Sequence, residues 1–225
     1  MVVPDGAVPD GASAPGGGGN PFSATASGNK LVISGGYLSV DAQGDGLDAN
    51  GSIEMSGGTV IVNGPTVNGN GPLDYDGTFI MTGGFLVAAG SAGMAQAASD
   101  TSTQYGVMMT YTQAQQAGTL VSLQDADGQS IVAFAPTKSY QSLYISSPEL
   151  TKGGTYTLYS GGTSTGTATN GLYKDGSVQD GAKVVSFEIS AINTWLNESG
   201  VTKARSGMMG GPGGQGGRFG QGGGR

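Results

Sequence analysis

The sequence predicts an all-β protein, in which a short parallel β-helix of about three coils is completed by a mainly antiparallel C-terminal β region. Three observations support this fold class: a repeat built around Gly-Gly pairs, apolar residues that alternate with other residues on both sides of each pair, and 45 glycines among 225 residues. Alternation with a period of two, in runs of about four residues, is typical of strands rather than helices.

The repeat occurs three times, with Gly-Gly pairs that begin at Gly35, Gly57 and Gly83. Each pair separates two short runs, and glycine allows the backbone to turn a corner between them. A unit that is buried on one side and turns at fixed points is typical of one coil of a parallel β-helix. The residues expected to face inward are Leu31, Ile33, Leu38 and Val40, then Ile53, Met55, Val60 and Val62, then Phe79, Met81, Leu86 and Ala88.

The rest of the chain contains further runs that read as strands. They cover residues 118–123, 130–134, 142–146, 155–159 and 184–189, and the pairs Asp127-Gly128 and Gly153-Gly154 favour hairpin connections between them. We expect this region to pack on the coils or to cap them, because an open coil end exposes unpaired backbone groups. Short helical turns are expected only near 113–117 and 191–197.

Composition divides the chain into four segments: a flexible Gly/Pro-rich linker (1–28), the coils (29–103), the C-terminal β region (104–198) and a Gly-rich disordered tail (199–225). The first and last segments offer few side chains that a core could bury. They suggest a module that is cut from, or tethered to, a larger protein.

Composition also excludes several functions. The chain has no cysteine and no histidine, which removes disulfides, thiolate or imidazole metal sites, thiol nucleophiles, and histidine as the general base of a Ser-His-Asp triad. A net charge of −7 argues against a nucleic-acid partner. No apolar run approaches the roughly 18 residues of a membrane span, and the first residues lack the pattern of a signal peptide.

Acidic residues recur at equivalent places in successive coils. Aligning residues 44–51 with residues 70–77 places Asp48 over Asp74, with Leu47 and Leu73 facing inward. Adjacent coils are about 4.8 Å apart, so two ionised carboxylates would repel unless a proton or a hard cation lay between them. The same alignment places Asn50 over Asp76, so these two aligned pairs are candidate oxygen ligands for calcium. The alternative is that Asp and Asn beside glycine only stabilise tight turns.

Outward aromatic residues indicate a surface for sugars. Tyr37, Tyr75 and Phe85 are predicted to stack on pyranose rings, with polar neighbours bonding the hydroxyls. The alternative is that a loop or the C-terminal region covers them. Catalysis is less favoured, because elimination beside calcium needs a strong base and the coils supply only Lys30, while no carboxylate is singled out as the acid of a glycosidase.

Several segments together resemble the calcium-containing, carbohydrate-binding β-helix family. They are residues 44–53, the Ser-Gly-Gly-Thr-Val sequence at 56–60, Gly64-Pro65 with residues 73–77, and Ser146-Ser147-Pro148 ahead of residues 154–159. The resemblance implies a right-handed parallel β-helix similar in fold to pectate lyases. It also implies that calcium is held by the acidic turns, at Asp45, Asp48, Asn50, Asp74 and Asp76. It also implies that the chain continues a longer protein with a secretion signal and earlier coils, possessing an upstream domain that is absent here.

The expected function is therefore that of a non-catalytic module, extracellular or at the cell surface, which binds cellulose or a related plant polysaccharide and uses calcium structurally. Two alternatives stay open. One is a calcium-dependent polysaccharide lyase acting on pectate, and the other is a structural surface protein or adhesin without affinity for glycans.

Overall fold

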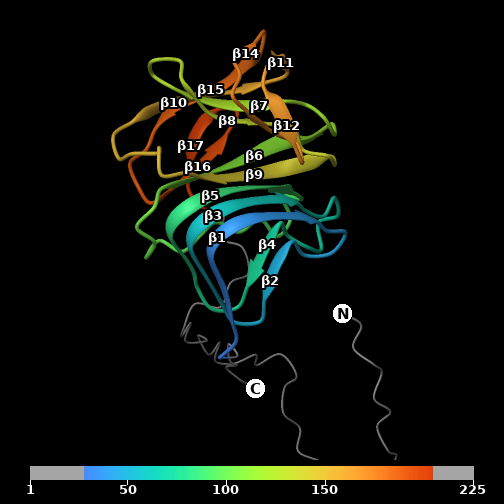
Figure 1. Ribbon diagram of the computed structural model, residues 1–225, viewed down its shortest axis with the longest axis vertical. Helices are drawn as coiled ribbons and strands as arrows, with labels where there is room; N and C mark the ends of the chain where they lie inside the picture. Colours follow the sequence, from blue (N-terminus) through green and yellow to red (C-terminus); the bar gives the residue numbers. More distant parts are fainter. Residues whose placement is uncertain (1–27, 205–225) are drawn as a thin grey trace, which may run out of the picture.

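The computed structural model describes residues 28–204, and every regular element in that range is a strand (Figure 1). Residues 1–27 and 205–225, which hold most of the predicted linker and tail, lie outside the described range. No helix that could span a membrane occurs in the described part of the chain. The strands are β1 (Lys30–Asp41), β2 (Leu47–Ala49), β3 (Ser52–Asn63), β4 (Leu73–Tyr75), β5 (Phe79–Gly90), β6 (Gly106–Gln115), β7 (Val121–Asp125), β8 (Ser130–Phe134), β9 (Tyr140–Ser146), β10 (Thr155–Ser160), β11 (Thr163–Ser164), β12 (Thr167–Thr169), β13 (Leu172–Lys174), β14 (Val178–Gln179), β15 (Ala182–Glu188), β16 (Asn193–Asn197) and β17 (Gly200–Thr202).

The largest sheet has seven strands in the order β1-β3-β5-β9-β6-β16-β17. β1, β3 and β5 are parallel, whereas β9 is antiparallel to both of its neighbours, β5 and β6. This sheet therefore joins strands from the predicted coils to strands from the predicted C-terminal region. β17 lies in the segment that composition assigned to the tail.

The predicted repeat is confirmed in β1, β3 and β5, which stack in the register Leu31 to Ile53 to Phe79. Each strand bends at its glycine pair, and the second glycine of each pair has positive φ: +81° at Gly36, +89° at Gly58 and +88° at Gly84. The inward residues predicted for the second and third copies are all buried, and they pack with Leu47 of β2 and Leu73 of β4. We call this apolar cluster the column.

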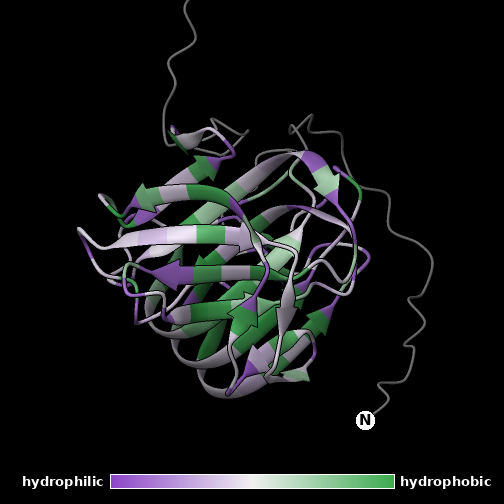
Figure 2. Ribbon diagram, turned by 90° about the horizontal axis from the view of Figure 1, so that it is seen from above, coloured by the Kyte–Doolittle hydropathy of each residue, from purple (hydrophilic) through white to green (hydrophobic). Residues whose placement is uncertain are grey.

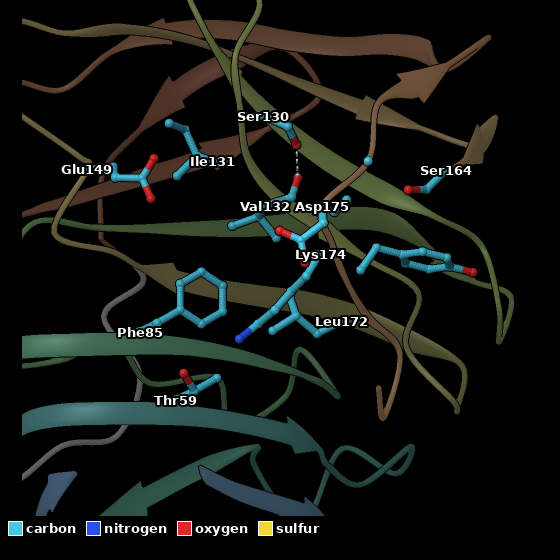
Figure 3. Close-up of a pocket in the computed structure, with 13 residues that line it drawn as sticks. Thr59, Phe85, Ser130, Ile131, Val132, Glu149, Ser164, Leu172, Lys174 and Asp175 are labelled. Carbon is cyan, nitrogen blue, oxygen red and sulfur yellow. Dashed lines mark hydrogen bonds between the residues drawn. The ribbon is translucent and has the colours of Figure 1, made fainter. Parts of the chain in front are cut away.

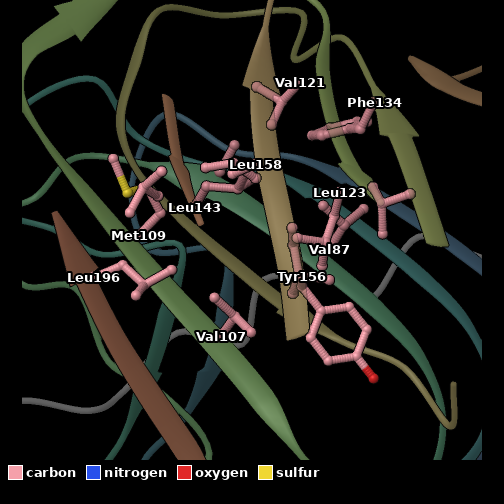
Figure 4. Packing of buried hydrophobic residues seen from close by; sticks show 14 of the residues in the cluster. Val87, Val107, Met109, Val121, Leu123, Phe134, Leu143, Tyr156, Leu158 and Leu196 are labelled. Atoms are coloured by element: carbon pink, nitrogen blue, oxygen red, sulfur yellow. The ribbon is translucent and has the colours of Figure 1, made fainter. Parts of the chain in front are cut away.

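A six-stranded antiparallel sheet, in the order β12-β13-β8-β7-β10-β15, covers the other face of the large sheet. Figure 4 shows Val87, Val107, Met109 and Leu143 of the large sheet beside Leu123 and Leu158 of the smaller one. Figure 2 shows that the hydrophobic segments of neighbouring strands lie next to one another. We call this second apolar cluster the intersheet core.

The intersheet core bears on two interpretations of the outward side of the coils. The sequence leaves open whether this side is a surface for sugars or is covered by the C-terminal region, and Ile61 and Val87 on it are fully buried. The C-terminal half covers the outward side of β3 and β5, whereas Ser39, the residue of β1 in register with Ile61, is exposed.

Two expectations about the C-terminal half are wrong. Residues 113–115 belong to β6 and residues 193–197 form β16, so the predicted helical turns are strands for most of their length. Gly153-Gly154 does not join a hairpin, because β9 and β10 belong to different sheets. The hairpin at Asp127-Gly128 is confirmed between β7 and β8. The Asp125 Oδ1 atom accepts the amides of Asp127 and Gln129, which closes this turn.

Candidate functional site

The acidic turns lie along the short parallel pair β2 and β4. Asp48 stands directly beside Asp74 in this pair, with Leu47 beside Leu73, and both leucines are buried in the column. Side chains alternate along a strand, so the two aspartates share the side that faces away from the column. The predicted register of these carboxylates is confirmed.

Two of these carboxylates also hold neighbouring turns together. Asp45 Oδ1 accepts a hydrogen bond of 2.7 Å from the Gly71 amide, which ties the turn before β2 to the turn before β4. Asp74 Oδ1 accepts a bond of 3.2 Å from the Gln96 side-chain amide. Asp45 thus links two successive turns, which differs from the alternative that these side chains only close their own tight turns.

The electrostatics of Asp74 reflect its surroundings. Partial burial raises the pKa of the Asp74 carboxyl, and the negative charges of Asp45, Asp48 and Asp76 raise it further. Asp48 and Asp76 are exposed, as is Asn50. Three carboxylates are therefore near enough to Asp74 to interact with it, and their repulsion of the ionised Asp74 opposes folding.

A preformed calcium site requires more than carboxylates that lie close enough to interact, because their oxygens must converge on one position. Within residues 28–204, no three acidic side chains converge on one position that could hold a metal ion. The predicted set of Asp45, Asp48, Asn50, Asp74 and Asp76 therefore does not form a complete carboxylate shell. Calcium normally takes six to eight oxygen ligands. An ion here would have to use the Asp48 and Asp74 pair together with oxygens that are not carboxylates.

Without added metal, we expect Asp74→Asn to raise the melting temperature at pH 7 by about 1 to 2 °C, the size expected of a half-exposed position. The folded-state pKa of Asp74 lies above its ordinary value, so the folded state binds this proton more tightly than the unfolded state does. The ionised carboxylate therefore costs stability above the raised pKa. The advantage of asparagine should shrink as the pH falls through the raised folded-state pKa toward about 4, the ordinary pKa of aspartate, because the folded-state carboxyl becomes protonated first.

Thermal melts from pH 7 to pH 4 in chelator measure this effect. Asp127→Asn is the matched control, because Asp127 is exposed in the β7–β8 turn, which belongs to a different sheet from β2 and β4. If the Asp74→Asn variant melted at a lower temperature than the parent at pH 7 in chelator, repulsion from the neighbouring carboxylates would not be the dominant effect at this position.

A second feature is a row of side chains on the outward side, just after the glycine corners. Tyr37, Thr59 and Phe85 are in register across β1, β3 and β5. Thr59 and Phe85 form one wall of a cavity of about 330 Å³, which opens between the two large sheets. We call this cavity the intersheet cleft.

The opposite wall of the intersheet cleft comes from β8, β13 and nearby loops. Figure 3 shows the Phe85 ring and the Lys174 side chain pointing toward the same space, with Glu149 at one side. The remaining polar lining is Ser130, Ser164, Tyr173 and Asp175. The Ser130 hydroxyl donates to the Val132 carbonyl at 3.2 Å, and Asp175 follows β13 with a φ of +57°.

The three predicted ligand-binding aromatics have different environments. Phe85 is half-buried, lines the intersheet cleft and packs on the intersheet core. Tyr37 is 46% exposed, and its hydroxyl donates to the Thr169 carbonyl and accepts from the Asn170 side chain. Tyr75 is wrong as a surface residue, because it is buried in the column, and its hydroxyl donates to the Ala97 carbonyl at 2.6 Å. Burial raises the pKa of the Tyr75 phenol.

Sequence reasoning missed the second wall of the intersheet cleft. Lys174, Asp175 and Glu149 lie in short segments with turn residues around them, and only tertiary pairing brings them opposite Phe85. It also missed a cavity of about 520 Å³ lined by Tyr75, Met94, Trp195 and several alanines. That second cavity is mainly apolar.

Comparisons of the chain with protein-family models, with curated proteins and with solved structures found no match. The proposed function therefore rests on the geometry of the molecule.

Proposed function

We propose that the protein binds polysaccharide in the intersheet cleft without cleaving it. The observation that supports this proposal is the pairing of an aromatic ring, Phe85, with a wall that carries Lys174, Asp175 and Glu149. A sugar ring has apolar C–H faces and a polar hydroxyl rim. A cavity with one aromatic side and several polar groups matches both features.

The Phe85 ring is well suited to stacking because it is held in place. Phe85 is part of β5, in register with Thr59 of β3, and its inner side packs on the intersheet core. A ring fixed by packing loses little side-chain entropy when a ligand binds. The cavity, at about 330 Å³, is at the small end of the range for ligand sites, which favours one or two sugar units of a longer chain.

The polar lining offers both kinds of hydrogen-bonding group. Lys174 supplies donors, Glu149 and Asp175 supply acceptors, and the hydroxyls of Ser130 and Ser164 can do either. Sugar hydroxyls donate and accept at once, so a site that recognises them needs both types. The mixed charge of the lining also accommodates a neutral glycan better than a strongly anionic one.

The proposal includes the architecture and setting that the family resemblance implies. In it, β1, β3 and β5 with the intervening β2 and β4 are coils of a right-handed parallel β-helix, and the protein acts outside the cell or at its surface. The parallel register of these strands and the shared corners at Gly36, Gly58 and Gly84 support the coil interpretation.

Calcium remains part of the proposal as a structural ion between the turns that carry Asp48 and Asp74. Its support is the close placement of those carboxylates and the raised pKa of Asp74, since a divalent cation would relieve that repulsion. Calcium should raise the melting temperature of the parent protein, and the increase should be lost in Asp74→Asn. Equal melting temperatures in calcium and in chelator would contradict the structural role.

Binding in the intersheet cleft is tested by pull-down on insoluble cellulose and by affinity electrophoresis in soluble glycans, including polygalacturonate. Phe85→Ala should weaken binding about tenfold, the loss expected when one good aromatic contact of about 1.4 kcal/mol is removed. Lys174→Ala should weaken it with little effect on stability, because Lys174 is exposed. Lys183→Ala is the matched control, since Lys183 is an exposed lysine on β15 outside the cleft.

Retained affinity in both Phe85→Ala and Lys174→Ala would overturn the assignment of the cleft. The same samples also test the absence of cleavage. Glu149 and Asp175 are the carboxylates that a hydrolase would use in this cavity. Release of reducing ends, lost in Glu149→Gln or Asp175→Asn, would make the protein a hydrolase, and a rise in ultraviolet absorbance on pectate would make it a lyase.

A further inference from the structure

The strand β1 ends the seven-stranded sheet and has one neighbour, β3, among the described strands. It is twelve residues long, so its outer edge presents a long row of backbone donors and acceptors. Edges of this length are ready to pair with another strand, and proteins usually shorten, charge or cover them. β1 carries charges only at its two ends, Lys30 and Asp41.

The column is also open at β1. Leu38 is 38% exposed, whereas Val60, its register partner on β3, is fully buried. Leu31 and Val40 are half-buried, and their partners Ile53 and Val62 are fully buried. One more layer of apolar side chains would bury the end of the column in the way that β1 buries β3.

The sequence of β1 is complementary to itself when the strand is reversed. In an antiparallel pair of two β1 strands centred on the glycine corner, Lys30 of one copy lies opposite Asp41 of the other. The inward residues then face each other as apolar pairs, Leu31 with Val40 and Ile33 with Leu38. Directly opposed apolar pairs and opposite charges are the contacts that stabilise neighbouring strands.

Backbone hydrogen bonding agrees with the same register. The Asn29 carbonyl and the Ala42 amide both bond to β3. The direction of backbone groups alternates along a strand, so Lys30 and Asp41 point their backbone groups toward the free edge. Val32 and Ser39, two residues further into the strand from each end, also point their backbone groups toward the free edge. In the reversed pairing, Lys30 lies opposite Asp41 and Val32 lies opposite Ser39, so each of these two pairs is hydrogen-bonded.

We propose that two copies of this chain dimerise through their β1 edges, antiparallel, about a two-fold axis that passes through the Gly35-Gly36 corner. Such an axis maps one arm of the bent strand onto the other arm of its partner, and the two columns become one continuous core. The interface is closed, because the same edge is used by both copies. The large sheet accepts an antiparallel neighbour at the other side of the stack, where β9 pairs with β5.

Sedimentation analysis of the full chain over a wide concentration range tests the proposal. At about 0.15 M salt, which screens repulsion between acidic groups of the two copies, the mass should rise from the 22.2 kDa of the monomer to twice that value. Ser39→Pro removes an amide that faces the free edge and should weaken dimerisation at least about tenfold, as loss of paired edge bonds predicts. Ser39→Ala is the matched control and should dimerise as the parent does.

Charge exchange tests the register itself. Asp41→Lys places a lysine opposite Lys30 of the other copy and should weaken the dimer, while adding Lys30→Asp restores an opposite pair and should strengthen it again. The internal ion pairs of Lys30 with Glu54 and of Asp41 with Lys138 are both lost in the double variant, so recovery reports only on pairing between copies. A mass of one chain at every concentration, as when residues before 28 cover β1, would overturn the proposal. A dimer whose affinity is changed neither by Ser39→Pro nor by the charge exchange would also overturn the proposal.

Discussion

Replacing Gly58 by alanine is expected to lower the free energy of unfolding by about 3 kcal/mol or more, which corresponds to a fall of about 6 to 12 °C in melting temperature. Gly58 has a φ of +89°, which costs an alanine about 1 to 2 kcal/mol. An added Cβ would also lie 2.8 Å from both the carbonyl carbon and the oxygen of Gly35 on the neighbouring strand. Relieving that overlap requires β1 and β3 to move apart at the corner.

Gly36→Ala is the matched control for this effect. Gly36 occupies the same corner in β1 with a φ of +81°, yet a Cβ there would meet no atom within 4 Å. It should therefore show the cost of the dihedral angle alone, about 1 to 2 kcal/mol. Thermal and denaturant melts of both variants, run at low concentration so that β1 edges remain unpaired, separate strain from stacking. Equal losses in the two variants would mean that close contact between the corners contributes nothing.

Truncating Ile61 to alanine is expected to destabilise the protein by about 2 to 5 kcal/mol, the usual range for large-to-small changes in a core. Ile61 is fully buried and belongs to the intersheet core. It lies on the side of β3 that faces away from the column, so this loss would measure how strongly the smaller sheet packs against the stack. Denaturant unfolding gives the free energy, and the slope shows whether the transition stays cooperative.

Val67→Ala is the control for Ile61→Ala, since Val67 is 59% exposed and belongs to neither core cluster. Its effect should stay within about 0.5 kcal/mol. If Ile61→Ala were equally mild, the two sheets would not be held together by the packing described above.

The stacked strands could be predicted because each copy of the repeat contains the local features that determine its structure. Gly36, Gly58 and Gly84 fix the corners, and period-two alternation fixes which side chains enter the column. The register of Asp48 with Asp74 follows from the same repeat, since aligned copies of one unit place equivalent residues on neighbouring strands. In β1 to β5, the local sequence pattern therefore predicts the position that each residue takes in the folded structure.

The covering of the outward side also has a signal in the sequence. Ile61 and Val87 are apolar at positions where β1 has Ser39. That change from polar to apolar along one row marks where the smaller sheet begins to cover the stack. Tyr75 is buried although an aspartate lies on each side of it, because alternation along β4 places its ring on the same side as Leu73.

β6 and β16 could not be recognised from local pattern. Residues 107–110 of β6 are buried on both faces, since they lie between the two core clusters, and so they show no alternation. β16 contains asparagine, threonine and tryptophan in an order that has no apolar period. The second wall of the intersheet cleft depends on pairing between β8 and β13, whose partners are far apart in the chain.

The position of β9 bears on how the molecule is made. β6 follows β5 in the chain but does not pair with it, because β9 takes the place between them. During synthesis on the ribosome, the edge of β5 that faces away from β3 therefore stays unpaired until residues 140–146 have emerged. Long-range closure of this kind slows folding and leaves strand edges exposed to other nascent chains. Slow emergence of residues 140–146 should therefore lower the yield of soluble protein.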